Sequence, residues 1–378
     1  MSNQPNISRV ELGIHYGTSF TIITEHCDKT VKSYKLEGKK VENERTAPNQ
    51  KLGFSGELLV VDSVFSGSGR DQDHDFASNV VAQFFDQTDI SYRLIKTASK
   101  SSVVELATSL EQAKDYIVLF LSGDTSISEF INSLPAAHAN ISILPFPMGT
   151  GNAWASSLNL SDPATIFSQF IRQELSYHDF PLYRATFDNG QSIKFFIILS
   201  LGFHANLLHL CEEEVYQQMG VERFRIASQR ILEDYELQCH ISISETLHGS
   251  YSYFALINTT HLEPTYLPSP DSDPLKSQLH VLAYESSLEK SDFQKKLMKG
   301  YQNSRHSDIS GIGTVYTPLP SSFVVKVSDD PSQKQKFEIC CDGQLLNLLE
   351  LNETHNIPSS IQIETCTEPS LKILHSLK

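Results

Sequence analysis

Two strand-to-helix junctions between residues 115 and 158 constrain the fold of this chain more than any other feature. In the first, the apolar run Tyr116–Leu121 is followed by Ser122-Gly123-Asp124, and apolar residues then recur at helical spacing. In the second, Ile141–Phe146 is followed by a glycine-containing turn, and a helix is expected from Ala153. Short apolar runs of this kind are typical of strands buried on both faces of a parallel sheet. Two such turns at adjacent carboxyl ends favour an anion, with phosphate as the first candidate.

Composition limits the classes of partner. The 378-residue chain is 40% hydrophobic, and its length predicts two domains. A formal net charge of -15 argues against broad contact with nucleic acid and against a polybasic membrane anchor. The six cysteines include no CxxC pair, so we expect reduced thiols without a zinc site. The longest apolar run is too short to span a membrane and the start lacks a signal-peptide pattern, which predicts a cytoplasmic protein.

The pattern along the chain predicts how the domains are built. Residues 1–56 contain short β-like runs and a polar stretch, which indicate a strand extension followed by a loop. Strand and helix patterns alternate over residues 57–178, which predicts a Rossmann-like α/β nucleotide-binding domain with a parallel sheet. Residues 179–378 read as strands joined by loops around one charged helical region. They predict a mainly antiparallel β-sandwich domain.

A third glycine-containing loop, Ser66-Gly67-Ser68-Gly69-Arg70, follows the expected first strand, Glu57–Asp62. Glycines in this position allow the backbone to approach a ligand closely. The loop is not a P-loop because it lacks the Lys-Ser/Thr pair. Alone, it is equally compatible with a plain flexible turn.

Several short motifs follow one another along the chain. They are Ser66-Gly67, Thr97, Ser122-Gly123-Asp124 with Glu129 and Asn132, Pro147-x-Gly149-Thr150-Gly151-Asn152, Gly202-Phe203-x-Ala205, Gly220-x-x-Arg223-Phe224 and Asp342-Gly343. In this order they resemble the catalytic region of the diacylglycerol kinase and sphingosine kinase superfamily, which is distantly similar to NAD kinases. The resemblance covers about residues 57–345. Ser122 and Ala153 favour the sphingosine and ceramide kinase branch.

The resemblance implies a two-domain lipid kinase of the NAD kinase and diacylglycerol kinase type. ATP with Mg²⁺ would bind in the interdomain cleft, and a hydroxyl of a sphingoid base or related lipid would accept the phosphoryl group. Peripheral membrane contact is expected, because the substrate is a lipid. Phosphoryl transfer needs positioning and charge neutralisation more than covalent chemistry, which agrees with clustered glycine turns.

The resemblance also implies roles for single residues. Asp124 would deprotonate or orient the acceptor hydroxyl, or act through a magnesium-bound water. Asp124 and Asp342 would face the metal, and Asn206 and Glu129 would contact the lipid substrate. The implied nucleotide-binding residues are Ser66, Gly67, Thr97, Ser122, Gly123, Gly149, Thr150, Gly151, Asn152, Arg223 and Asp342.

Each of these residues also has a structural interpretation. Asp124 could cap the helix that it begins, and Thr150 or Asn152 could cap the following one. Arg223 lies in a charged segment, where a solvated side chain is the default, and Glu129 could simply pair locally. Asp342-Gly343 is also a common hairpin turn. The functional interpretation depends on the motifs occurring together.

The sequence departs from the family pattern at four places. Thr125 replaces a glycine, Gln344 replaces a glutamate, and Ser63-Val64 replaces an Asn-Pro pair. Asn206 stands where the family has an acidic residue that, in sphingosine kinases, is thought to recognise the polar head of the base. These changes favour a second hypothesis, a degenerate kinase fold that binds lipid or nucleotide as a regulator. The retained Asp124 favours an active kinase, because loss of an acceptor-activating group would reduce the rate most directly.

Overall fold

The structure is a computed structural model of the chain. It describes residues 6–27, 30–41, 53–67, 69–99, 101–219, 222–234, 237–244, 247–302, 305, 309–352 and 357–376. Gly220 of the Gly-x-x-Arg-Phe motif lies outside these residues.

Contacts divide the chain into two compact units. One consists of Met1–Phe180 with Pro369–Lys378, and the other of Pro181–Glu368. The domain limits expected from the sequence, 57–178 and 179–378, stay a prediction. The contacts differ from them at the C-terminal side, where the residues from Pro369 belong with the first unit.

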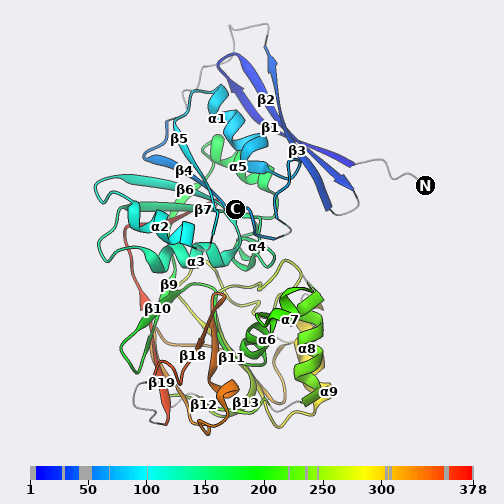
Figure 1. The fold of residues 1–378 in the computed structure, drawn as a ribbon, viewed down its shortest axis with the longest axis vertical. Coiled ribbons are helices and arrows are strands. Elements are labelled where there is room, and N and C mark those ends of the chain that lie inside the picture. Colours follow the sequence, from blue (N-terminus) through cyan, green and yellow to red (C-terminus); the bar gives the residue numbers. More distant parts are fainter. Residues whose placement is uncertain are drawn as a thin grey trace, which may run out of the picture. The chain divides into compact units, whose positions relative to one another are not determined.

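The first unit is built on a six-stranded sheet in the order β5-β4-β6-β7-β20-β8 (Figure 1). Five of its strands run parallel, and β8 pairs antiparallel with β20. The predicted α/β fold with a parallel sheet is therefore confirmed. The strands are β4 (Glu57–Asp62), β5 (Tyr92–Lys96), β6 (Asp115–Ser122), β7 (Asn140–Pro147), β8 (Ser176–Asp179) and β20 (Leu371–His375).

Helices cover both faces of this sheet, with α1 and α5 on one side and α2 and α3 on the other in Figure 1. The first helical region of this unit is a π-helical segment, η1, that continues into α1. Large apolar side chains such as Phe84 and Phe130 are fully buried beneath the helices. The helical elements are η1 (Ala77–Ala82), α1 (Gln83–Gln87), α2 (Ser101–Ser109), α3 (Asp124–Ser133), α4 (Ala153–Ser157) and α5 (Pro163–Ile171).

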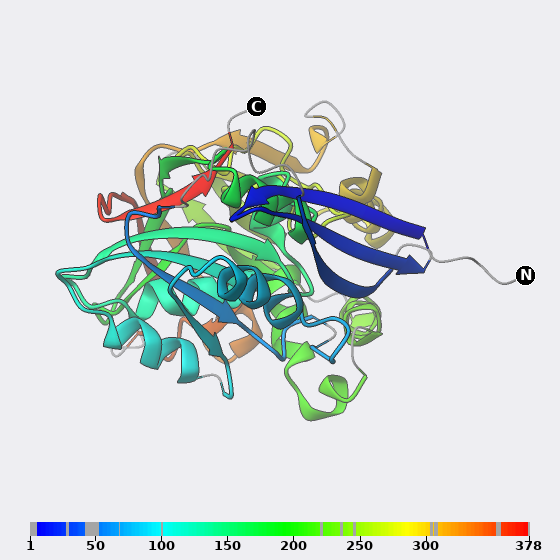
Figure 2. The same cartoon turned by 90° about the horizontal axis from the view of Figure 1, so that it is seen from above.

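A separate three-stranded antiparallel sheet precedes the parallel one. It consists of β1 (Asn6–His15), β2 (Thr18–Cys27) and β3 (Thr30–Lys40), which form the dark blue meander of Figure 2. Its inner face packs on the helices: the Phe20 and Phe84 rings lie 5.1 Å apart, and the Ser168 hydroxyl donates to the Glu11 carbonyl at 2.7 Å. The meander thus extends the core of the first unit.

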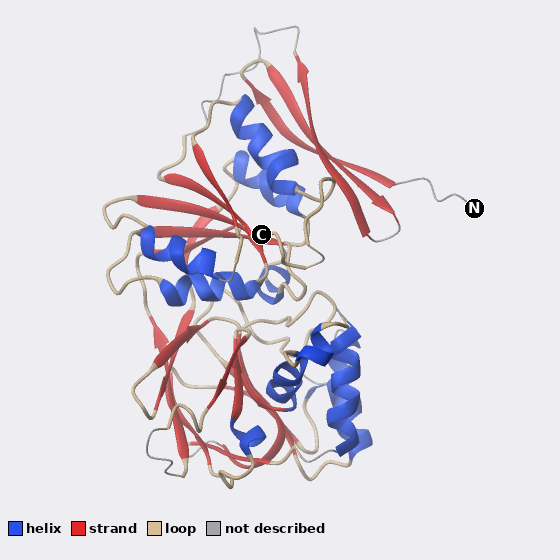
Figure 3. Ribbon diagram, viewed as in Figure 1, coloured by secondary structure: helices blue, strands red, loops and turns tan. Residues whose placement is uncertain are grey.

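The second unit is an eleven-stranded antiparallel sheet with helices beside it (Figure 3). The predicted antiparallel β domain is confirmed, and its strands join in one hydrogen-bonded sheet around buried side chains such as Phe254 and Val325. Its strands are β9 (Leu182–Phe187), β10 (Ser192–Phe195), β11 (Ile198–Gly202), β12 (Cys239–Ile243), β13 (Leu247–Ile257), β14 (His280–Glu285), β15 (Thr314–Pro318), β16 (Ser322–Val327), β17 (Glu338–Cys341), β18 (Gln344–Asn347) and β19 (Ser359–Cys366). Its helices are α6 (Phe203–Cys211), α7 (Glu214–Gln217), α8 (Glu222–Asp234), α9 (Lys290–Lys299), η2 (Gly300–Gln302) and η3 (Lys334–Phe337).

None of the helices in the described part of the chain has the length and apolar character needed to cross a membrane.

Candidate active site

Three turns meet at the carboxyl edge of the parallel sheet, after β4, β6 and β7. A Cβ atom on Gly149 would lie 2.3 Å from the Cα of Gly123 and 2.9 Å from its nitrogen. Gly67 has φ +64°, and a Cβ there would lie 3.0 Å from the Met148 carbonyl oxygen. The turns therefore touch backbone to backbone, and only glycine fits where they meet. The two corners predicted from the sequence lie side by side.

Arg70 occupies the junction of these turns. Its guanidinium donates to the Asp62 carboxylate at 3.2 Å, to the carbonyls of Leu121 and Met148 at 3.2 and 3.3 Å, and to the Ser66 carbonyl at 3.1 Å. The side chains of Arg70 and Asp62 are 6% and 1% exposed. Burial raises the pKa of Asp62 above its usual value, while the Arg70 charge opposes that rise. Sequence motifs predicted no role for either residue.

Asp124 begins α3, and its carboxylate reaches the start of another helix. One oxygen accepts from the Ala153 N–H at 2.6 Å and the other from the Trp154 N–H at 3.3 Å, both in the first turn of α4. Asp124 therefore caps α4 rather than its own helix, and it connects the turn after β6 with the turn after β7. Burial raises the pKa of Asp124 to about 6, and the two N–H groups oppose that rise. At pH 7.5 the carboxylate is therefore largely ionised.

The Gly149–Asn152 turn is closed by its own side chain. Asn152, at φ 50°, accepts from the Gly149 N–H at 2.7 Å and donates its amide to the Gly149 carbonyl at 2.8 Å. These two bonds shape the turn, and the predicted nucleotide-binding role of Asn152 stays a prediction. The N–H groups of Thr150 and Gly151 have no hydrogen-bond partner among the residues that the structure describes. They are the donors of this turn that an anion could use.

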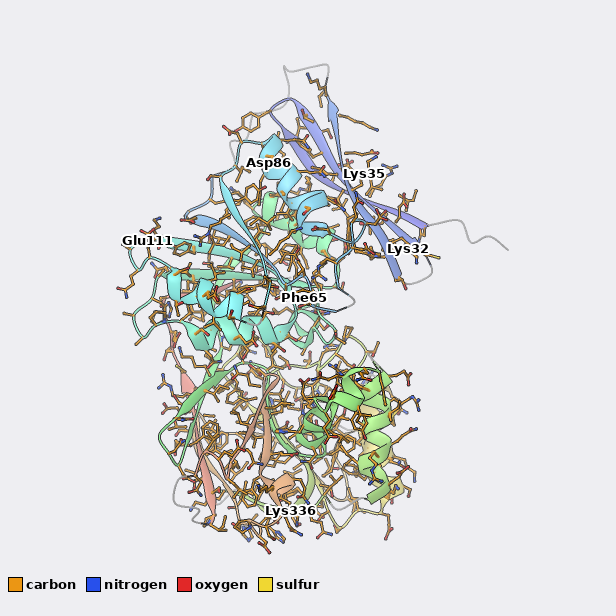
Figure 4. The ribbon with its side chains drawn as sticks, viewed as in Figure 1. Lys32, Lys35, Phe65, Asp86, Glu111 and Lys336 are labelled. Atoms are coloured by element: carbon orange, nitrogen blue, oxygen red, sulfur yellow. The ribbon has the colours of Figure 1, made fainter. Side chains whose placement is uncertain are left out.

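The other predicted residues of the first unit lie around these turns. The Ser66 N–H bonds the Ser63 carbonyl at 2.9 Å, the buried Thr97 donates its N–H to the Asp62 carbonyl at 3.0 Å, and the Ser122 hydroxyl donates to the Gly123 carbonyl at 3.0 Å. Glu129 lies half-buried on α3. At the tip of the turn after β4, Phe65 is 76% exposed (Figure 4).

Asp342, in the second unit, is buried and accepts three backbone hydrogen bonds. It lies in the hairpin between β17 and β18 at φ 46° and is 4% exposed. Its carboxylate accepts the N–H groups of Phe196, Ile197 and Ile198 at 2.7, 3.0 and 2.8 Å. Three N–H dipoles directed at one carboxylate fit an anchor that fixes β11 to the hairpin. The predicted metal and nucleotide roles of Asp342 stay predictions.

Metal ligands were predicted at Asp124 and Asp342. Over the described ranges, no group of three or more His, Cys, Asp or Glu side chains is placed to hold a metal ion. Asp124 is the carboxylate among the described residues of the three turns, and it accepts only one N–H at each oxygen, so it has the chemistry of a magnesium ligand.

The remaining predicted residues of the second unit lie on its helices. Asn206, on α6, donates its amide to the Glu338 carboxylate at 2.6 Å and to the Gln335 carbonyl at 2.7 Å. Asn206 thus has a carboxylate directly beside it, contributed by a residue distant in sequence. Arg223, on α8, has a buried Nε without a partner among the described residues, and its guanidinium carbon lies 5.0 Å from the Phe224 ring centre. These contacts leave the predicted binding roles of both residues as predictions.

Comparisons with known proteins agree with this arrangement. Residues 59–180 match the family model of the diacylglycerol kinase catalytic domain. A crystal structure of a diacylglycerol kinase from Bacillus anthracis is 13% identical, with a TM-score of 0.56 over 85% of this chain and 97% of that one. A structure of a candidate diacylglycerol kinase from the same organism is also 13% identical, with a TM-score of 0.58 over 86% of this chain and 98% of that one. No curated protein matches the sequence.

An α/β domain and an antiparallel β domain make up the fold, and the solved structures share it. The match to the diacylglycerol kinase catalytic domain covers residues 59–180, and it supports the resemblance of this segment to the diacylglycerol kinase-like superfamily. At 13% identity, the likeness to the solved structures establishes the fold alone.

Proposed function

We propose that this protein is an ATP-dependent lipid kinase that phosphorylates a hydroxyl of a sphingoid base or a related lipid. The observation that carries the proposal is the position of Asp124 among three glycine turns, two of which touch backbone to backbone at Gly123 and Gly149. A carboxylate with a pKa of about 6 is ionised at neutral pH and yet basic enough to accept a proton.

In the proposed reaction, the acceptor oxygen attacks the γ-phosphorus of ATP, ADP leaves, and the hydroxyl proton passes to Asp124. The two N–H bonds from α4 fix the carboxylate and leave each oxygen able to accept one further hydrogen bond. The N–H groups of Thr150 and Gly151, with the backbone at Gly67, would receive the phosphates, and Ser66, Thr97, Ser122 and Glu129 would border them. Mg²⁺ bound with ATP would neutralise phosphate charge, with Asp124 as the residue of these turns that could face it.

A sphingoid or ceramide-like acceptor is supported by Ser122 and Ala153, the two positions that match that branch. Asn206 has the Glu338 carboxylate at 2.6 Å, so a negative group is present beside the neutral amide. We propose that the protein is cytoplasmic and meets its lipid through peripheral contact with a membrane.

The second hypothesis, a regulator that has lost catalysis, keeps two specific observations in its favour. The Asn152 amide hydrogen-bonds within its own turn, and the Asp342 carboxylate accepts three backbone N–H groups. Thr125, Asn206 and Gln344 remove features of the family pattern. A protein of this kind would still bind Mg-ATP or lipid, without turnover.

Transfer of radiolabel from ATP to a panel of sphingoid bases, ceramide and diacylglycerol tests the proposal. We expect one lipid class to be labelled by the wild type, and labelling to be lost in Asp124→Ala. Equal labelling by the two proteins would exclude Asp124 as the catalytic base. Binding of Mg-ATP in a thermal-shift assay, without labelling of any lipid, would support the regulator instead.

A further inference from the structure

The Arg70 guanidinium is buried where the three turns meet, and the sequence motifs do not account for it. Its Nε–H bonds Asp62, its Nη1 bonds the Ser66 carbonyl at 3.1 Å and the Gly69 carbonyl at 3.4 Å, and its Nη2 bonds the carbonyls of Leu121 and Met148. Arginine has five N–H donors, and all five have an acceptor here.

These acceptors belong to different segments of the chain. Asp62 ends β4, Ser66 and Gly69 lie in the turn after it, Leu121 is near the end of β6, and Met148 begins the turn after β7. The Leu121 carbonyl also accepts the Ser63 N–H at 3.1 Å, and the Met148 N–H bonds the Ser122 carbonyl at 3.2 Å. One side chain therefore contacts the turns after β4 and β7 and the end of β6.

The planar guanidinium of arginine can bond several carbonyls in fixed directions, which the flexible ammonium group of lysine cannot do. Lysine offers three donors from a single nitrogen, so it could keep the ion pair with Asp62 but could not reach the carbonyls of three segments in the same geometry. Asp62 is 1% exposed, and its Oδ2 has no partner among the described residues. Arg70 is consequently the charge that compensates this buried carboxylate.

We propose that Arg70 is a positioning residue that holds the turns after β4, β6 and β7 as one preorganised anion-binding unit. The identity of the anion as the ATP phosphates rests on the proposed function. In this arrangement Arg70 acts through backbone carbonyls, and the N–H groups on the outer side of the same turns remain directed to the ligand. The proposal predicts that loss of the Arg70 hydrogen bonds makes all three turns more mobile. These turns are distant in sequence, since Met148 lies 78 positions from Arg70.

Arg70→Lys in the full chain is the test, with Arg93→Lys as its matched control. Arg93 lies on β5 of the same sheet, its side chain is 49% exposed, and it pairs with Glu57 at 3.9 Å. Hydrogen–deuterium exchange of the ligand-free protein measures whether the amide exchange rates of the three turns change together. We expect Arg70→Lys to speed exchange about tenfold in residues 63–67, 121–124 and 148–149 together, with the centres of β4 and β6 unchanged. Arg93→Lys should match the wild type throughout.

Calorimetric titration with Mg-ATP is the second measurement. We expect Arg70→Lys to bind about tenfold more weakly than the wild type, since disordered turns must be reordered on binding. Faster exchange confined to residues 63–67, or wild-type exchange in all three segments, would overturn the proposal. So would wild-type nucleotide affinity in a variant whose three turns exchange faster.

The results that would refute the proposed function differ from those that would refute the role of Arg70. If the wild type binds no nucleotide, the function proposed above is wrong, and the exchange experiment still decides whether Arg70 couples the turns. If Arg70→Lys does not fold, Asp62→Asn replaces it, because that variant removes the ionic partner and keeps the four carbonyl contacts of Arg70. Faster exchange in all three segments then supports the proposal, and faster exchange next to residue 62 alone overturns it.

Discussion

Replacing Asp124 with asparagine should change how the stability of the protein depends on pH. The asparagine keeps the size of the side chain and one acceptor for the α4 N–H groups, but it cannot titrate. Burial raises the pKa of Asp124 from 3.8 to about 6 in the folded protein. The folded state therefore binds more protons than the unfolded state between these values, and ∂ΔG of unfolding/∂pH is negative for this group.

The size of the effect follows from that shift. Stability contributed by protonated Asp124 is fully present below pH 3.8 and is lost as the pH rises through about 6. Two pKa units correspond to about 3 kcal/mol over the whole window, and the accessible part between pH 7.5 and pH 5.0 is about 1 kcal/mol. The wild type should gain this amount over Asp124→Asn when the pH is lowered.

Urea denaturation of both proteins at pH 7.5, 6.0 and 5.0 measures the difference, and all other titrating groups cancel between them. Asp89→Asn, at an exposed position of the same unit, controls for the loss of a carboxylate. A difference that stays constant over this range, or that favours the wild type as the pH rises, would show that the α4 N–H groups stabilise the charge more than burial opposes it.

Three further predictions concern the same residues and their neighbours. In a lipid-labelling assay, kcat/KM should fall below about pH 6 as Asp124 becomes protonated, and a profile flat down to pH 5 would argue against Asp124 as the base. Gly149→Ala should lower the free energy of unfolding by about 3 kcal/mol, because its Cβ would lie 2.3 Å from Gly123, whereas Gly53→Ala, with nothing within 4 Å, should unfold like the wild type. Asp342→Ala should destabilise by about 3 kcal/mol in urea, since it leaves three buried N–H groups unpaired. Binding of Mg-ATP to the folded fraction of that variant should be unchanged, and a stable variant that no longer binds would restore Asp342 to the site.

Local sequence patterns predicted the framework of the first unit because its central strands, β4, β6 and β7, are buried on both faces. Tyr116–Leu121 and Ile141–Phe146 lie within β6 and β7, and the glycines after them are needed where the two turns touch. The strand at Leu371–His375 was not predicted, since a five-residue run can be placed beside β7 only by a long-range contact.

Side-chain partners were the least predictable part of the site. Asp124 is itself an obvious candidate, yet its acceptor role toward α4 depends on a contact 29 residues away. Arg70 looked like the end of a flexible loop, and only the fold brings Leu121 and Met148 to its guanidinium. The clue in the sequence was an aspartate at the end of a buried strand with an arginine eight residues later.

The place of β20 between β7 and β8 has a consequence for biosynthesis. The ribosome makes residues 371–375 only after the whole of Pro181–Glu368, so the sheet of the first unit stays incomplete until then. In the nascent chain, β7 would present an unpaired edge, the kind of template on which chains aggregate. A premature stop codon just after residue 368 would make that transient exposure permanent.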